Sequence, residues 1–331
     1  MIISKTPYRI SFFGGGSDYP VWYQKYGGSV ISTTIDKYLY ISLRELPKFF
    51  NHKYRIVYSK VEQVNSINNI EHHVIRKGLK RYNIKNHLEI HYDGEMPAKS
   101  GVGSSSSFIV GFLNILENLK NNSIKKNVLA KKSILFEQKI LNENVGSQDQ
   151  VAAAYGGFNH IIFYKNKDYS VNKINIKNQF FENLNRNLFL IYTGIQRTSS
   201  LVSSTYINKL ITSKKTYIDN ILDIVCEAKK VIQSKKNLND FGKLLHETWI
   251  LKKNLSNVMS SKKIDDIYSY CINNGALGGK ILGAGSGGFL LVYVPRNKQK
   301  KLLSEIKKKN LVIPFNFSSK GSEIIYKSKK I

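Results

Sequence analysis

Four consecutive serines after a Gly-Val-Gly turn form the pattern in this chain that best suits anion binding. They end the segment Pro97-Ala-Lys-Ser-Gly-Val-Gly-Ser-Ser-Ser-Ser107. Before it, Leu88, Ile90 and Tyr92 alternate with polar residues as in a strand, and after it apolar residues recur at helical spacing. Glycine lets the main chain approach a ligand closely, and the first turn of a helix offers unpaired N–H groups. The pattern predicts a phosphate-binding loop, although a tight turn with a capping serine has the same composition.

A second candidate for ligand binding lies near the N-terminus, where a short predicted strand, Tyr8 to Phe13, runs into three glycines followed by Ser17 and Asp18. Such a turn can bring the backbone against a polyhydroxylated ligand while Asp18 accepts hydrogen bonds from its hydroxyl groups. Arg9 on the strand could bind an anion or steer a carboxylate. A flexible turn is the simpler alternative.

Glu137 and Asp149 are a plausible pair of catalytic carboxylates. Asp149 follows Gly-Ser-Gln, where an aspartate is most often a helix cap. The alternative is that one carboxylate abstracts a proton while the other binds a magnesium ion.

The glycine-rich stretch from Gly275 to Val294 contains Gly283, Gly285 and Gly288, which match the letters of the dinucleotide-binding fingerprint. That fingerprint must open a helix, whereas an apolar strand pattern follows these glycines. The stretch is therefore expected to pack against the serine-rich loop or against a bound nucleotide or sugar. Arg197, in a separate polar segment, could line a pocket or cap the next helix.

Hydrophobic periodicity predicts a mixture of strands and helices. We expect a domain boundary near residue 185, which divides the chain into 1–185 and 186–331. The expected strands are 27–46, with a break near Asp36, then 55–59, 158–165 and 189–193. A polar stretch, 165–187, separates the last two, and the expected helices are 70–80, 125–141, 200–233, 237–256 and 261–274.

The composition is that of a globular protein with a strong excess of positive charge. Of 331 residues, 42% are hydrophobic, and 51 Lys+Arg against 23 Asp+Glu give a formal charge of +28. The lysines are scattered, which favours attraction of phosphorylated small molecules over a nucleic-acid interface. Cys226 and Cys271 are expected to be small buried residues. No apolar run approaches the roughly 18 residues of a membrane span, and the opening residues predict a strand instead of a signal peptide, so we expect a cytoplasmic protein without a membrane partner.

In order and spacing, three of these motifs resemble those of the GHMP small-molecule kinases. They are Pro7-x-Arg9 with Gly14-Gly-Gly-Ser-Asp18, the Pro97 to Ser106 segment, and Lys280-x-x-Gly283-Ala-Gly-Ser-Gly-Gly288. The central motif departs from the common Gly-Leu-Gly-Ser-Ser-Ala form by Val102 and Ser106. The triple glycine, the segment 28–37 and the Gln-Asp-Gln turn resemble the branch that phosphorylates the anomeric hydroxyl of sugars.

The resemblance implies an α+β fold, with a ribosomal protein S5 domain 2-like first domain and a ferredoxin-like second domain. It also implies ATP as co-substrate, Mg²⁺ as cofactor, and a catalytic role for Asp149 and Arg9 at the anomeric hydroxyl. Mg²⁺ is assigned to Ser105, Ser106 and Glu137. ATP binding is assigned to Pro97, Lys99, Ser100, Gly101, Val102, Gly103, Ser104, Ser105 and Ser106. Substrate binding is assigned to Arg9, Ser17, Asp18, Tyr19, Arg197, Gly283 and Gly285.

The expected acceptor is a heptose 7-phosphate, whose product would supply nucleotide-activated heptose for surface polysaccharide. Arg197 and Lys99 are candidates for the cation that such a phosphate needs. Fucose or another hexose is the alternative acceptor, and an isoprenoid alcohol is disfavoured by the Gly-Gly-Gly-Ser-Asp motif. A basic, non-catalytic nucleic-acid-binding protein is the alternative of another class. The partners are thus a sugar phosphate and ATP, with no nucleic acid expected, and assembly of identical chains is compatible with this assignment.

Overall fold

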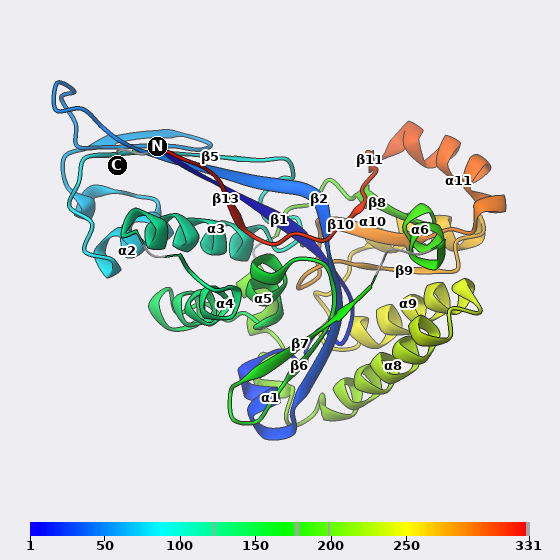
Figure 1. Cartoon of the computed structure of the whole chain (residues 1–331). Coiled ribbons are helices and arrows are strands. Elements are labelled where there is room, and N and C mark those ends of the chain that lie inside the picture. Colours follow the sequence, from blue (N-terminus) through cyan, green and yellow to red (C-terminus); the bar gives the residue numbers. More distant parts are fainter. Residues whose placement is uncertain (122, 176–178, 198, 329–331) are drawn as a thin grey trace.

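A nine-stranded sheet forms the frame of the first half of the molecule in the computed structural model (Figure 1). The structure describes residues 1–331 apart from 122, 176–178, 198 and 329–331. The main strand order is β13-β1-β2-β5-β3-β4, while β12 and β6 also pair with β2, and β7 pairs with β6. The strands are β1 (Ile2–Phe13), β2 (Gly28–Glu45), β3 (Tyr54–Val57), β4 (Val61–Val64), β5 (Leu88–Gly94), β6 (Phe158–Phe163), β7 (Tyr169–Ile174), β12 (Phe317–Ser318) and β13 (Glu323–Lys327).

Helices cover one face of this sheet, and α3 lies at their centre (Figure 1). They are α2 (His73–Arg81), α3 (Ser104–Leu119), α4 (Lys126–Leu135) and α5 (Gln148–Tyr155), with the short α1 (Pro20–Tyr26) after β1. Most of α3 is buried because its apolar residues surround the helix. For example, the rings of Phe108 and Phe112 stack with centroids 5.8 Å apart. This packing fixes the N-terminus of α3 relative to the strands.

The second half contains a smaller antiparallel sheet in the order β11-β8-β10-β9. Its strands are β8 (Leu188–Tyr192), β9 (Gly278–Ile281), β10 (Phe289–Tyr293) and β11 (Val312–Ile313). The helices of this half are α6 (Gln179–Arg186), α7 (Ser199–Ser204), α8 (Lys215–Ser234), α9 (Leu238–Lys253), α10 (Lys262–Asn273) and α11 (Arg296–Lys309). Among the described residues, no helix has both the length and the apolar character needed to cross a membrane.

Aromatic side chains join the two halves into one core. Phe12 of β1 packs edge to face on Phe241 of α9, with centroids 5.2 Å apart, and stacks on Phe158 of β6 at 5.3 Å. Phe317 of β12 also packs on Phe158, at 5.6 Å. Fully buried aromatic rings contribute large apolar areas, so this cluster holds the end of β1 against the second half.

The structure corrects several expectations about the elements. β2 is one continuous strand, and the expected break near Asp36 is only an irregularity, because the register against β1 shifts between Thr34 and Tyr38. The polar stretch 165–187 contains β7 and α6, and the expected helix 200–233 is divided into α7, a 3₁₀ turn and α8. Cys271 is buried, as expected, but Cys226 is exposed.

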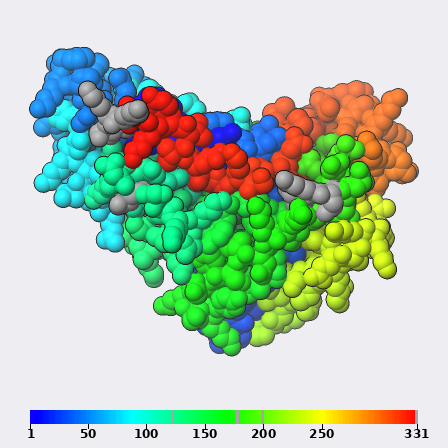
Figure 2. Space-filling view, viewed as in Figure 1, coloured from blue at the N-terminus to red at the C-terminus, as the bar shows by residue number. Residues whose placement is uncertain are grey.

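The end of the chain returns to the first half. β13 pairs with β1, and β12 pairs with β2. In Figure 2 this C-terminal segment, in red, runs across the visible face. The expected assignment of all of 186–331 to a second domain therefore does not fit residues 317–327, while the boundary near residue 185 stays a prediction.

Candidate active site

The serine-rich segment lies at the start of a helix, as its sequence predicts. α3 begins at Ser104, and its N-cap residue, Gly103, has a left-handed φ of 76°. Gly101 also has a positive φ, 83°, which an L side chain rarely adopts. Within the described residues no side chain caps this helix, so N–H groups of its first turn can meet an anion.

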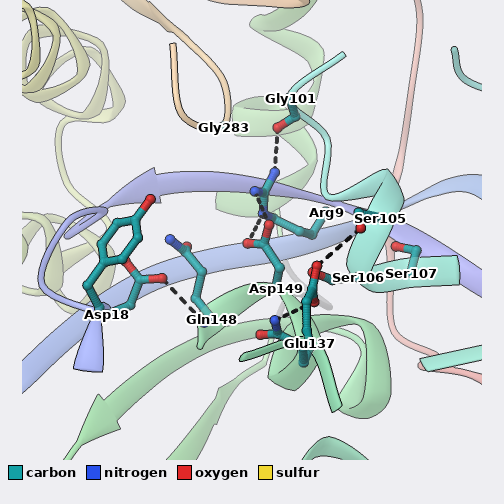
Figure 3. Close-up of polar contacts among 12 residues, drawn as sticks. Arg9, Asp18, Gly101, Ser105, Ser106, Ser107, Glu137, Gln148, Asp149 and Gly283 are labelled. Carbon is teal, nitrogen blue, oxygen red and sulfur yellow. Dashed lines mark hydrogen bonds and ion pairs between the residues drawn. The ribbon is translucent and has the colours of Figure 1, made fainter. Parts of the chain in front are cut away.

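The glycine-rich loop between β9 and β10 packs directly on this turn. A Cβ on Gly283 would lie 2.7 Å from Cα of Gly101, and one on Gly288 would lie 2.1 Å from the carbonyl oxygen of Ser100. The N–H of Phe289 donates to the same carbonyl at 3.0 Å. Of the two roles considered for this stretch, packing against the serine-rich loop is confirmed (Figure 3).

Arg9 clamps the carboxylate of Asp149 (Figure 3). Arg9 lies in β1 beside a register shift against β2, and such irregularities re-aim side chains. Its Nε and Nη2 donate to the two oxygens of Asp149 at 2.6 and 2.5 Å, and its Nη1 donates to the carbonyl oxygen of Gly101 at 2.6 Å. The side chain of Arg9 is only 4% exposed and that of Asp149 is 23% exposed. The carboxylate is therefore fixed by two charge-assisted hydrogen bonds while part of it reaches the cleft.

Asp18 lies in the turn after β1, facing the start of α5. Its oxygens accept hydrogen bonds from the N–H of Gly16 at 3.0 Å and from the N–H of Gln148 at 3.3 Å. Its carboxylate has a raised pKa, because the group is buried and because Asp149 lies nearby. The next residue, Tyr19, is also buried, and its hydroxyl lies 3.4 Å from that of Tyr206.

Glu137 lies in a single π-helical turn, Phe136–Ile140, that continues α4. Such turns are frequent at functional sites. Its Oε2 accepts hydrogen bonds from Ser106 Oγ at 2.8 Å and from Gln150 Nε2 at 2.6 Å, and its Oε1 accepts one from Ser105 Oγ at 3.1 Å (Figure 3). Burial raises the pKa of Glu137 to about 7, although the bonds from Ser106 and Gln150 act in the opposite direction.

The donor set around Glu137 fits a magnesium ion. Mg²⁺ takes oxygen ligands, usually one or two carboxylates with substrate phosphates and water. Here a buried carboxylate lies with two serine hydroxyls at the N-terminus of α3. The described part of the chain contains no cluster of three or more His, Cys, Asp or Glu side chains able to hold a metal. An ion at Glu137 would therefore depend on phosphate oxygens for part of its shell.

These groups line one cavity of about 230 Å³ between the two halves. The structure brings together most of the residues that the sequence predicts for the site. Those that line the cavity are Arg9, Asp18, Tyr19, Lys99, Gly101, Gly103, Ser104, Ser105, Ser106, Glu137, Asp149 and Gly283.

Six other predicted site residues do not line this cavity: Pro97, Ser100, Val102, Ser17, Arg197 and Gly285. Two of them are serines whose hydroxyls donate within their own turns, from Ser17 to the carbonyl of Gly14 at 2.8 Å and from Ser100 to that of Pro97 at 2.6 Å. Pro97 thus braces the loop through its carbonyl. The predicted ligand contacts of these residues stay predictions.

The remaining three lie outside the cavity for different reasons. Val102 is fully buried in the hydrophobic core, and Arg197 is exposed to solvent. Gly285 faces Met259, because a Cβ there would lie 2.2 Å from its Sδ. Of this group, only the backbone of the phosphate-loop members remains suited to ligand binding.

Among the cavity residues that sequence reasoning missed are Ser11, Gln148, Lys252 and Lys280. Lys280 belongs to the third motif but was given no role. Lys252 lies in α9 beside Lys253, where a single sequence suggests two solvated lysines. Ser11 lies two residues after Arg9 in β1, so strand alternation could have placed both side chains on the same face.

Comparison with known proteins identifies the family. The model of the GHMP kinases N terminal domain matches residues 68–157, and that of the GHMP kinases C terminal domain matches residues 218–312. Together they cover more than half of the chain. The chain belongs to the GHMP kinases. The expected two-domain α+β fold of this family is thereby confirmed, and both glycine-rich loops of the cleft belong to a GHMP kinase.

Individual GHMP kinases resemble this chain over two thirds of its length or more. The D-glycero-alpha-D-manno-heptose 7-phosphate kinase of Campylobacter jejuni is 29% identical, over 97% of each chain. The mevalonate kinase of Methanocaldococcus jannaschii is 28% identical over 69% of each chain. The crystal structure of a D-glycero-D-manno-heptose 1-phosphate kinase from Bacteroides thetaiotaomicron superposes with a TM-score of 0.80, covering 99% of this chain and 100% of the other at 22% identity.

Proposed function

We propose that this GHMP kinase transfers the γ-phosphoryl group of ATP to the anomeric hydroxyl of D-glycero-D-manno-heptose 7-phosphate. The observation that carries the proposal is the Asp149 carboxylate, clamped by Arg9 in a cleft between the N-terminus of α3 and the Asp18 turn. The Campylobacter relative, which matches 97% of each chain, supports the choice of acceptor. The product would be a heptose 1,7-bisphosphate.

Asp149 is the proposed general base. As the anomeric oxygen attacks the γ-phosphorus, its proton passes to the carboxylate. The new O–P bond forms while the bond to the oxygen shared with the β-phosphate breaks, and ADP leaves. Arg9 orients the carboxylate through its two hydrogen bonds. A positioned base of this kind contributes about 10²- to 10⁴-fold to the rate.

The backbone N–H groups at the start of α3 bind the ATP phosphates, because the helix N-terminus favours negative charge. Lys99 adds a cation at the loop. Ser105, Ser106 and Glu137 hold Mg²⁺, which supplies charge neutralisation at the transferring phosphate. Asp18 and Tyr19 orient the hydroxyl groups of the sugar.

We propose in addition that residues 1–185 bind the nucleotide and that most of 186–331 forms the ferredoxin-like domain. ATP and sugar phosphates are cytoplasmic metabolites, so we expect the enzyme to act in the cytoplasm. The expected location follows from the proposed reaction and fails with it.

A coupled assay of ADP release tests the function. Purified protein with ATP and Mg²⁺ is offered heptose 7-phosphate, fucose, mannose and mevalonate. We expect the highest kcat/KM with heptose 7-phosphate, and a ³¹P signal coupled to the anomeric proton in the product. Preferred turnover of fucose or mannose would move the assignment to a hexose 1-kinase, and preferred turnover of mevalonate to an isoprenoid kinase. No turnover of any acceptor would contradict the proposal.

A further inference from the structure

Two buried lysines line the wall of the cavity that faces Asp18. Lys252 comes from α9 and Lys280 from β9, and these residues are 8% and 3% exposed. The proposed transfer of phosphate assigns neither of them a role. Burying an ammonium group costs several kcal/mol unless an opposite charge compensates it, so their presence here needs a physical reason.

Backbone carbonyls hold both ammonium groups without neutralising them. Lys280 Nζ donates to the carbonyl of Phe12 at 2.8 Å, and Lys252 Nζ donates to those of Ile281 at 3.0 Å and Gly283 at 2.5 Å. No ion pair joins either lysine to a carboxylate within the described residues. An ammonium has three donors, so Lys280 retains two and Lys252 retains one for a further acceptor.

The charges around the pair leave room for an anion. Arg9, the neighbouring cation, is already engaged by Asp149. Burial lowers the pKa of Lys252 to about 7, and the nearby Arg9 acts in the same direction. Burial also lowers the pKa of Lys280, as does the proximity of Lys252. Asp18 opposes these effects at both lysines, but it is itself buried with a raised pKa. A bound dianion would remove much of this penalty.

Two unpartnered polar atoms independently indicate a ligand in the same place. Ser11 Oγ and Gln148 Oε1 are buried and have no hydrogen-bond partner in the described structure, and both residues line the cavity. Buried polar groups are normally satisfied. Gly15 lies between them, since a Cβ there would come within 3.8 Å of Ser11 Oγ and 3.7 Å of Gln148 Nε2. The space is thus bounded by hydrogen-bond donors and acceptors that have no partner among the described residues.

We propose that Lys252 and Lys280 bind the phosphate group that the acceptor sugar already carries, while Ser11 and Gln148 bind its hydroxyl groups. The inference rests on the proposed function and makes it more specific. The ATP phosphates have their own seat at the N-terminus of α3, on the wall that carries Asp149. The lysine pair, which comes from α9 and β9, therefore selects phosphorylated acceptors and orients them toward Asp149.

The test compares heptose 7-phosphate with the same heptose lacking the phosphate, in the full-length wild type and in Lys252→Met and Lys280→Met. Lys253→Met is the matched control, because Lys253 is the next residue of α9 and instead pairs with Asp265 at 3.6 Å. We expect each buried-lysine variant to lower kcat/KM for the phosphorylated sugar by about 10- to 100-fold, as for the loss of a charged hydrogen bond. Turnover of the unphosphorylated sugar and the KM for ATP should change little. The ratio between the two acceptors does not depend on how much of a variant is folded.

Equal losses with both acceptors, or a raised KM for ATP with an unchanged acceptor ratio, would overturn the inference. Calorimetric binding without ATP separates it from the function itself, with inorganic phosphate as the second probe. Binding of the sugar phosphate that both lysine variants weaken, in an enzyme without turnover, supports the phosphate seat and contradicts the kinase. Turnover with an acceptor ratio that the variants leave unchanged supports the kinase and contradicts the phosphate site. A wild type that binds neither heptose 7-phosphate nor inorganic phosphate also overturns the inference.

Discussion

Charged side chains are compensated differently on two walls of the cleft. The paired wall, at the N-terminus of α3, includes Arg9, Asp149 and Glu137, and the unpaired wall, beside α9, includes Lys252 and Lys280. On the α3 wall the two carboxylates near the reaction have partners, since Arg9 holds Asp149 and two serines and Gln150 hold Glu137. On the α9 wall, Lys252 and Lys280 are buried against backbone carbonyls and have no carboxylate partner within the described part of the chain. The carboxylates of one wall are thus compensated without a ligand, whereas the lysines of the other are not.

This difference suits one wall to catalysis and the other to the choice of acceptor. A base must hold its geometry before substrate arrives, because preorganised groups cost no reorganisation during the reaction. Cations that are left unpaired gain most from an anionic ligand, since that ligand removes their desolvation penalty. Damage to the first wall should therefore appear mainly in kcat, and damage to the second mainly in the choice of acceptor.

The largest effect should come from Asp149→Asn on the paired wall. The amide keeps the size of the side chain but cannot accept the anomeric proton, so we expect kcat to fall about 10³-fold or more, while KM values change little. ADP release under saturating substrates measures this loss. A variant that retained a tenth of wild-type kcat would show that Asp149 is not the base.

The contact between the Gly101 turn and the glycine-rich loop after β9 should be nearly as sensitive to substitution. In Gly101→Ala a Cβ would lie 2.5 Å from the carbonyl oxygen of Leu282 at a φ of 83°, so we expect a loss of about 2 to 4 kcal/mol in the free energy of unfolding. Urea unfolding measures it. Gly15→Ala is the control, because the nearest side-chain atom would lie at 3.7 Å. Equal stability of the two variants would mean that the loops do not need their close contact.

Glu137→Gln should change the metal requirement of the paired wall. The amide removes the charge but can keep hydrogen bonds to Ser105 and Ser106. We expect the Mg²⁺ concentration for half-maximal activity to rise about 10- to 100-fold. A magnesium titration at saturating ATP checks this, with the thermal unfolding midpoint as the folding control. An unchanged titration would place the ion elsewhere.

The smallest effect concerns the stability of the unpaired wall. The pKa of Lys252 is lowered to about 7, so between pH 7 and the ordinary lysine range the unfolded chain binds more protons than the folded protein. The free energy of unfolding should then rise with pH, by about 1 to 2 kcal/mol from pH 7 to 8.5 for this residue. Urea unfolding should show a larger gain in the wild type than in Lys252→Met, because Lys280, whose pKa is also lowered, still contributes in the variant. Parallel curves would mean that Lys252 remains charged and compensated.

The sequence alone determined much of the paired wall. A glycine-rich turn between a strand and a helix predicts an anion-binding site, and α3 begins at Ser104 as that pattern requires. Asp149 stood out because it follows a Gly-Ser-Gln turn, and Glu137, on the preceding predicted helix, was its candidate partner. Patterns of neighbouring residues were sufficient to predict those parts of the site that backbone groups form.

Only the tertiary structure determined the unpaired wall and the failed contacts. Burial of Lys252 depends on α9 packing against β9, which no local pattern encodes, and Gly285 differs from Gly283 in what lies opposite it. The return of β12 and β13 to the first sheet likewise depends on pairing across about 280 or more residues. Side-chain chemistry and backbone conformation can be read from neighbouring residues, but burial and charge compensation are set by segments distant in the chain.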